Sequence, residues 1–204
     1  MSGRTDVQAK ILPASEARNW VHTWPTAVVS LVNPEDGHLV ARSPRPLDTL
    51  RIFVADVTDP EHEHAARSGD VAELIAFGER LEDGAKVLFH CRGGIGRSPA
   101  AAVITLVAAG WSPAEALDEV EQVRRVAKPN SWFLLLADAL MTPAQRHGVF
   151  SSYVAWASQK AWWYPVPNAI VRDAVAGRLD WSKSCDLVRA QTHRERDVDR
   201  GPFR

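Results

Sequence analysis

The chain has 204 residues, 46% of them hydrophobic, which is enough for one generous domain with a buried core. Lys and Arg total 24 against 25 Asp and Glu, and the formal net charge of -1 argues against a nucleic-acid-binding protein, which would need a basic surplus. No apolar segment reaches the roughly 18 residues of a membrane span, and the N-terminus lacks the apolar region of a signal peptide, so we expect a cytoplasmic protein that does not bind membranes.

Three short apolar runs predict buried β-strands. Residues 27–32 (AVVSLV) are bounded by Pro25 and by a turn-like segment that begins at Asn33. Residues 50–55 (LRIFVA) end in a polar loop, and residues 86–89 (KVLF) lead into a glycine-rich segment. Such short apolar runs between turn signals are typical of buried strands.

Helices are predicted between and after these strands. The third one begins at a capping box, which Ser112 forms with Glu115. Strands that alternate with helices predict an α/β fold, with a central, mostly parallel sheet flanked by helices. The predicted helical segments are residues 69–81, 97–109, 112–126 and 131–141.

The composition changes after about residue 143, where aromatic residues become frequent. We expect one or two helices, broken by Pro165 and Pro167, followed by a charged, frayed tail. The predicted organisation is therefore a domain of residues 1–145 and a Trp-rich helical C-terminal extension of residues 146–204. Four tryptophans lie in the last third of the chain: Trp156, Trp162, Trp163 and Trp181.

The clearest chemical pattern lies between the third predicted strand and the second predicted helix. It reads His90-Cys91-Arg92-Gly93-Gly94-Ile95-Gly96-Arg97-Ser98. The three glycines allow the backbone N–H groups of this loop to surround a tetrahedral oxyanion, which the N-terminus of the following helix also attracts. Arg97 would bind two oxygens of the same oxyanion with its planar fork of donors. The predicted substrate-binding residues are Arg92, Gly93, Gly94, Ile95, Gly96 and Arg97, although a position in solvent is an equal alternative for Arg92.

Cys91 is the predicted nucleophile. The positive features around it favour the thiolate form at neutral pH, and a thiolate can attack phosphorus. The hydroxyl of Ser98 would donate to the sulfur and make it a better leaving group when water releases the phosphate. We expect His90 to pack behind the loop and to fix its geometry rather than to carry protons. The other cysteine, Cys185, belongs to no CxxC pattern, so we expect two free thiols in a reducing setting.

The pattern HC-x5-R-S is the signature of the protein tyrosine phosphatase superfamily, and HCRGGIGRSPAAA resembles the sequences of its dual-specificity and bacterial branches. The resemblance extends over about residues 27–141 and includes the segments SPAEALDEVEQVRR and PNSWFLLLADAL. It implies the cysteine-phosphatase fold. It also implies a hydrolase that removes phosphate, through a phosphocysteine intermediate, from phosphotyrosine-containing or dual-specificity phosphoprotein substrates.

The same resemblance implies an upstream aspartic acid that protonates the leaving oxygen and then activates water. Asp56 follows the predicted strand LRIFVA directly, as the acid does in the dual-specificity and bacterial branches. Asp59 has the spacing to the cysteine that is more usual in some dual-specificity members. We favour Asp56 and keep Asp59 as the alternative, since an aspartate before Pro60 is also a common turn residue.

Other functions fit parts of the pattern. His62 and His64 suggest a metal pair, but no third ligand stands at a suitable spacing, so we expect a solvated loop, no metal and no other cofactor. A pseudophosphatase would bind phosphorylated partners without turnover, and a sulfurtransferase of the rhodanese type would also present a cysteine on an anion-binding loop. The complete set of Cys91, Arg97 and Ser98 favours the enzyme over both, with a phosphorylated protein or a small phosphoester as its expected partner.

Overall fold

A computed structural model describes residues 4–39, 42–43, 45–141 and 148–160. Its centre is a four-stranded sheet in which every neighbouring pair of strands is parallel, in the order β1-β4-β2-β3. The predicted α/β class with a parallel sheet and flanking helices is therefore confirmed. The strands are β1 (Val7–Pro13), β2 (Ala27–Val32), β3 (Asp48–Phe53) and β4 (Ala85–Cys91), and a 3-10 helix, η1 (Pro34–Leu39), follows β2.

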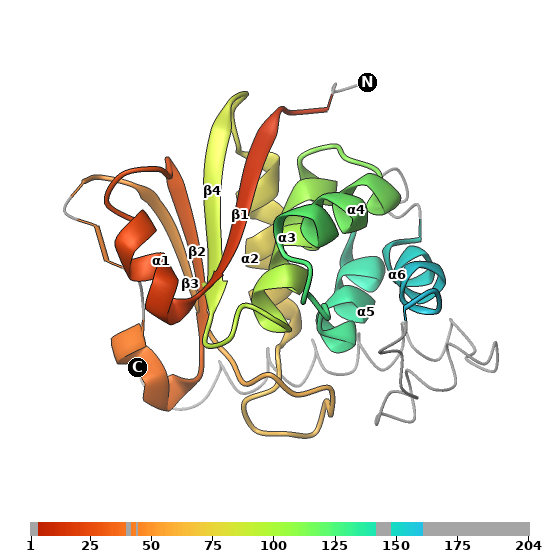
Figure 1. Cartoon of the computed structure of the whole chain (residues 1–204). Coiled ribbons are helices and arrows are strands. Elements are labelled where there is room, and N and C mark those ends of the chain that lie inside the picture. The colour runs from red at the N-terminus through yellow and green to blue at the C-terminus, as the bar shows by residue number, and fades with distance from the viewer. Residues whose placement is uncertain (1–3, 40–41, 44, 142–147, 161–204) are drawn as a thin grey trace, which may run out of the picture.

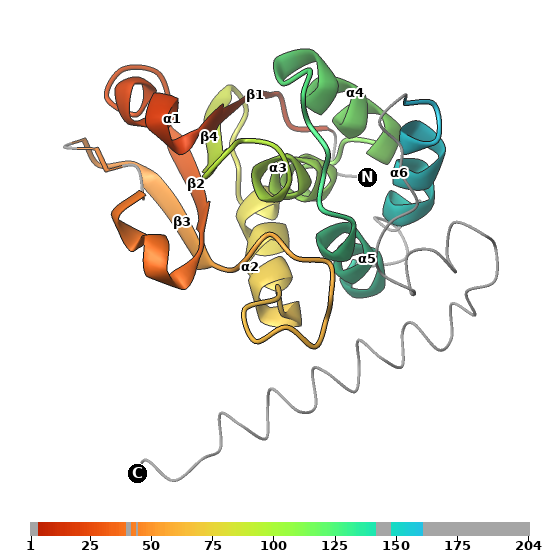
Figure 2. The same ribbon diagram turned by 60° about the horizontal axis from the view of Figure 1, so that its bottom comes forward.

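Helices cover both faces of this sheet (Figures 1 and 2). One face carries the short helix α1 (Ala14–Trp20), whose Ala17 belongs to a small buried cluster with Val21, Val28 and Leu88. The other face carries α2 (Ser68–Glu79), α3 (Arg97–Ala108), α4 (Pro113–Val123), α5 (Ser131–Leu140) and α6 (Val149–Ala157).

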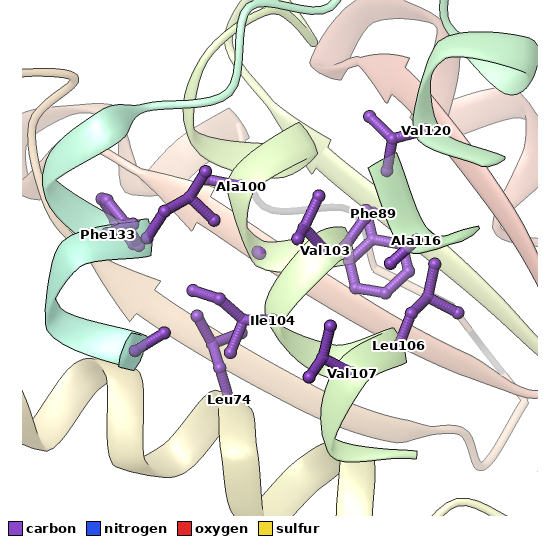
Figure 3. Close-up of a cluster of buried hydrophobic side chains, with 14 of the residues drawn as sticks. Leu74, Phe89, Ala100, Val103, Ile104, Leu106, Val107, Ala116, Val120 and Phe133 are labelled. Atoms are coloured by element: carbon purple, nitrogen blue, oxygen red, sulfur yellow. The ribbon is translucent and has the colours of Figure 1, made fainter. Parts of the chain in front are cut away.

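The helix α3 is the centre of the main core. Its residues are buried from Arg97 to Val107, as expected for a helix surrounded by other elements. Figure 3 shows its side chains between Leu74 of α2, Phe89 of β4 and Phe133 of α5. This packing fixes the start of α3, and with it the loop that enters the helix from β4.

Two elements at the N-terminal end were not predicted. In β1, only the alternating residues Val7, Ala9 and Ile11 are buried deeply, and three apolar residues among charged neighbours are a weak signal. The helix α1 has seven residues and no side-chain cap. The predicted strand at residues 50–55 begins at Asp48 instead and ends at Phe53, so that Asp56 lies in the following loop.

The helix α6 packs against α4 and α5, and its residues Phe150 and Trp156 belong to the same buried cluster as α3. The remaining part of the predicted extension, including Cys185 and the prolines at 165 and 167, lies outside the described residues. The division at residue 145 stays a prediction. None of the helices within the described ranges is long and apolar enough to cross a membrane.

Candidate active site

The predicted phosphate-binding loop connects β4 to α3 at the carboxyl edge of the sheet. The connection between β3 and α2 lies at the same end (Figure 1). Gly94 has a φ of +64°, and a Cβ there would lie 2.7 Å from the backbone carbon of Leu12, so this position requires glycine for two independent reasons. The loop is therefore held against β1 as well as between β4 and α3.

The sulfur of Cys91 accepts two hydrogen bonds inside this loop. The backbone N–H of Gly94 donates to Sγ over 3.2 Å, and the hydroxyl of Ser98 donates to the same atom over 3.2 Å. Cys91 is the last residue of β4 and is only 1% exposed. Donors of this kind stabilise a sulfur anion. The structure thus brings together Cys91 and Ser98, as the sequence predicted.

Arg97 is buried at the start of α3, and its guanidinium is held by the residues that directly follow β2 and β3. Its Nη1 donates to Oδ1 of Asn33 over 2.8 Å and to the carbonyl oxygen of Val54 over 2.7 Å. Its buried Nε has no hydrogen-bond partner among the described residues. An unpaired buried donor is costly unless a ligand satisfies it, so Arg97 keeps one donor suited to an oxyanion.

Asn33 is a site residue that the sequence analysis missed. It directly follows β2 at the carboxyl edge of the sheet, and besides holding Arg97 it donates to the side chains of Glu35 and Asp36. Its position at this edge was the available signal, because ligands of parallel sheets bind beyond the carboxyl ends of the strands.

The two candidate acids are placed differently. The carboxylate of Asp56 faces Gly96, where an added Cβ would lie 2.7 Å from the Asp56 carboxyl carbon, and its Oδ1 accepts a hydrogen bond from the side-chain amide of Asn130 over 2.8 Å. Asp59 instead accepts a hydrogen bond from the backbone N–H of Glu61 over 3.0 Å. Asp56 therefore faces the loop, whereas Asp59 closes a turn.

His90 lies behind the loop and is fully buried. Its Nε2 is 2.7 Å from the hydroxyl of Ser30 on the adjacent strand. Burial, with a smaller contribution from the charge of Arg18, lowers the pKa of His90 to about 4. The imidazole is thus neutral near pH 7 and connects β4 to β2.

Two side chains of the loop point outward. Ile95 is 42% exposed although it is apolar. The guanidinium of Arg92 is mostly exposed and lies 3.9 Å from the carboxylate of Asp36.

His62 and His64 lie in the loop between β3 and α2. The described part of the chain contains no group of three His, Cys, Asp or Glu residues that could hold a metal ion.

No protein-family model matches the sequence, and no curated protein matches it. Among solved structures, human DUSP28 is 20% identical, with a TM-score of 0.48 over 74% of this chain and 95% of that one. The active form of Tk-PTP is 28% identical, with a TM-score of 0.46 over 68% of this chain and 92% of that one. A mouse putative dual specificity phosphatase, complexed with zinc tungstate, is 22% identical, with a TM-score of 0.45 over 71% of this chain and 83% of that one.

Proposed function

We propose that this protein is a phosphatase that hydrolyses phosphate monoesters through a phosphocysteine intermediate on Cys91. One observation carries the proposal. A buried sulfur with two hydrogen-bond donors lies in a glycine-rich loop, beside an arginine whose Nε has no protein partner in the described residues. These are the groups that an oxyanion and a thiolate nucleophile require.

In the first half of the reaction, the Cys91 thiolate attacks phosphorus. The S–P bond forms as the bond from phosphorus to the ester oxygen breaks, and Asp56, in its acid form, gives its proton to that oxygen. The loop N–H groups and Arg97 bind the oxygens of the transferred group, whose negative charge they stabilise in the transition state. The products of this half are the free alcohol or phenol and the phosphocysteine.

In the second half, water attacks the phosphocysteine. The Asp56 carboxylate takes a proton from the water as the new P–O bond forms and the S–P bond breaks. The hydroxyl of Ser98, which already donates to Sγ, stabilises the departing thiolate. Inorganic phosphate leaves, and the enzyme returns to its starting state with no cofactor consumed.

The proposed substrates are phosphotyrosine-containing or dual-specificity phosphoproteins. The exposed apolar side chain of Ile95 on the loop favours an ester with an apolar or aromatic group next to the phosphate. Arg92 offers a positive charge at the rim for an acidic neighbour. Because a thiolate nucleophile must stay reduced, we place the activity in a reducing compartment such as the cytoplasm.

The test is hydrolysis of an aryl phosphate by the wild type, Cys91→Ser and Cys185→Ser. We expect Cys91→Ser to be inactive and Cys185→Ser, which removes the other thiol, to keep wild-type turnover. Orthovanadate should inhibit both active proteins. Binding of phosphopeptides by the wild type without turnover would support a pseudophosphatase instead, and sulfur transfer from thiosulfate to cyanide would support a rhodanese.

A further inference from the structure

Four consecutive carbonyl groups of the loop, those of Gly93 to Gly96, accept hydrogen bonds from one other segment of the chain, the connection between α4 and α5. The backbone N–H of Lys128 donates to the Ile95 carbonyl over 2.8 Å, and that of Asn130 donates to the Gly96 carbonyl over 3.1 Å. The two carbonyls before these, of Gly93 and Gly94, accept from a single side chain, that of Arg124.

Arg124 binds these two carbonyls with two different nitrogens. Its Nε donates to the Gly94 oxygen over 3.1 Å, and its Nη2 donates to the Gly93 oxygen over 3.1 Å. Arg124 is the C-cap residue of α4 and is half-buried. The fork geometry is specific to arginine, because lysine presents a single ammonium group.

The other side of one of these peptide groups faces the sulfur. The peptide that joins Gly93 to Gly94 has its carbonyl on Arg124 and its N–H on Cys91 Sγ. In a planar trans peptide the C=O and N–H bonds point in opposite directions, so a donor that fixes the carbonyl also fixes the direction of the N–H. The next peptide joins Gly94 to Ile95. Arg124 also binds its carbonyl, and this contact fixes the direction of the Ile95 N–H in the same way.

These are also the peptides that most need to be fixed. Gly93 and Gly94 are adjacent glycines, and glycine loses more backbone freedom on ordering than any other residue. Gly94 additionally has a φ of +64°, in a region that glycine enters and leaves readily. A rotation of either peptide would turn a carbonyl dipole toward the sulfur and the oxyanion, which would repel both.

We propose that Arg124 is a positioning residue, which holds the two peptides around Gly94 with their N–H groups directed at the Cys91 sulfur and the bound oxyanion. This inference rests on the proposed function, since it takes the loop to be the oxyanion site. Arg124 touches neither the sulfur nor the substrate. It acts through the loop backbone, so its loss weakens anion binding and thiolate stabilisation together.

Arg125 provides a matched control. It is the next residue, it carries the same charge, it is exposed, and its side chain makes no hydrogen bond or ion pair with another described residue. Arg124→Ala removes the charge and the fork, Arg124→Lys keeps the charge without the fork, and Arg125→Ala removes one charge but keeps the fork. Any effect of general electrostatics should therefore appear in both alanine variants.

The experiment measures two quantities that do not require turnover, on the full chain. One is the affinity for tungstate, an oxyanion with the shape of phosphate, by titration calorimetry. The other is the pH midpoint for alkylation of Cys91 by iodoacetamide, followed by mass spectrometry. For Arg124→Ala we expect tungstate to bind roughly tenfold more weakly or worse, the size of one lost hydrogen bond to a charged donor, and the alkylation midpoint to move to higher pH. Arg124→Lys should recover only part of both, and Arg125→Ala should behave as the wild type.

Tungstate affinity of Arg124→Ala within about twofold of the wild type, or an equal loss in Arg125→Ala, would overturn the inference. If Arg124→Ala does not fold, Arg124→Lys must still bind tungstate more weakly than Arg125→Ala. If the wild type hydrolyses aryl phosphates through Cys91 but the Arg124 variants bind tungstate and are alkylated as the wild type is, only this inference fails. A wild type that neither hydrolyses aryl phosphates nor binds tungstate would remove the proposed function, and this inference with it.

Discussion

The side-chain amide of Asn130 donates to the Asp56 carboxylate over 2.8 Å, while the backbone N–H of the same asparagine donates to the carbonyl of Gly96 over 3.1 Å. One residue thus connects the loop that carries the candidate acid to the loop that carries the nucleophile. Its side-chain oxygen Oδ1 also accepts a hydrogen bond from the backbone N–H of Trp132 and so caps α5. The position of Asp56 therefore depends on how α5 begins.

The first prediction concerns the choice of acid. Asp56→Ala should lower turnover of phenyl phosphate by about 100-fold or more, the usual contribution of a general acid, and by less for an ester with a better leaving group. Asp59→Ala should stay close to the wild type, because its carboxylate closes a turn. Steady-state rates with a series of aryl phosphates measure both. The reverse ranking of the two variants would move the acid to Asp59 and leave the reaction class intact.

The second prediction concerns Asn130. Asn130→Ser keeps a side-chain oxygen to cap α5 but is too short to reach Asp56, so it should lower turnover by roughly tenfold, less than Asp56→Ala does. In the Asp56→Ala background the same substitution should have little further effect, because its partner is already gone. A double-mutant cycle on turnover measures this coupling. Equal losses in both backgrounds would mean that Asn130 acts independently of the acid.

The third prediction concerns Gly96. A Cβ at this position would lie 2.7 Å from the carboxyl carbon of Asp56, and the obstacle is a side chain that can move away. Gly96→Ala should therefore fold and bind tungstate, yet lose turnover as Asp56→Ala does. Gly69→Ala is the matched control, since an added Cβ there meets no atom within 4 Å. Wild-type turnover in Gly96→Ala would show that Asp56 does not need the position it has in this structure.

Much of the sheet was predictable because its central strands are continuous apolar runs. The strand at residues 27–32 is buried at every position, and a short apolar run of this length between turn residues is typical of a buried strand. The strand β1 was not predicted, because it pairs with β4 along its whole length but lies at the edge of the sheet, where only alternate residues need to be apolar. Its partner is distant in the sequence, so only tertiary pairing reveals it.

The residues of the candidate site also differ in whether the sequence alone predicts them. Cys91, Arg97 and Ser98 lie in one contiguous motif whose chemistry is readable residue by residue. Asn33 and Arg124 reach the site from separate connections. The place of Asn33 at the carboxyl end of a strand was a signal for it, whereas nothing in the local sequence distinguishes Arg124 from an ordinary polar residue at the end of a helix. Contacts with backbone carbonyls leave little trace in a single sequence, because they depend on the path of the loop.

The fourth prediction concerns stability and pH. Burial lowers the pKa of His90 in the folded protein to about 4, against an ordinary value of about 6.5 when the chain is unfolded. Between these values the unfolded state binds a proton that the folded state does not, so the free energy of unfolding decreases as the pH falls. The stabilisation is complete above pH 6.5, and about 2 kcal/mol of it is lost at pH 5.

Urea unfolding of the wild type and His90→Gln at pH 7.5 and pH 5 isolates this group, since other titrating residues contribute to both proteins. The difference in stability between the two proteins should shrink at pH 5. A difference that does not change with pH would show that His90 is not the group responsible.

The central claim is that phosphate passes through Cys91, and trapping the intermediate tests it most directly. Asp56→Ala should be mixed with an aryl phosphate that has a good leaving group, quenched in acid within one turnover and digested for mass spectrometry. In this variant the first step can still proceed, whereas the activation of water is impaired. We predict a phosphoryl group on the peptide that contains Cys91, and none on that peptide in Cys91→Ala. If phosphate is released while the Cys91 peptide stays unmodified at every time point, the mechanism is contradicted.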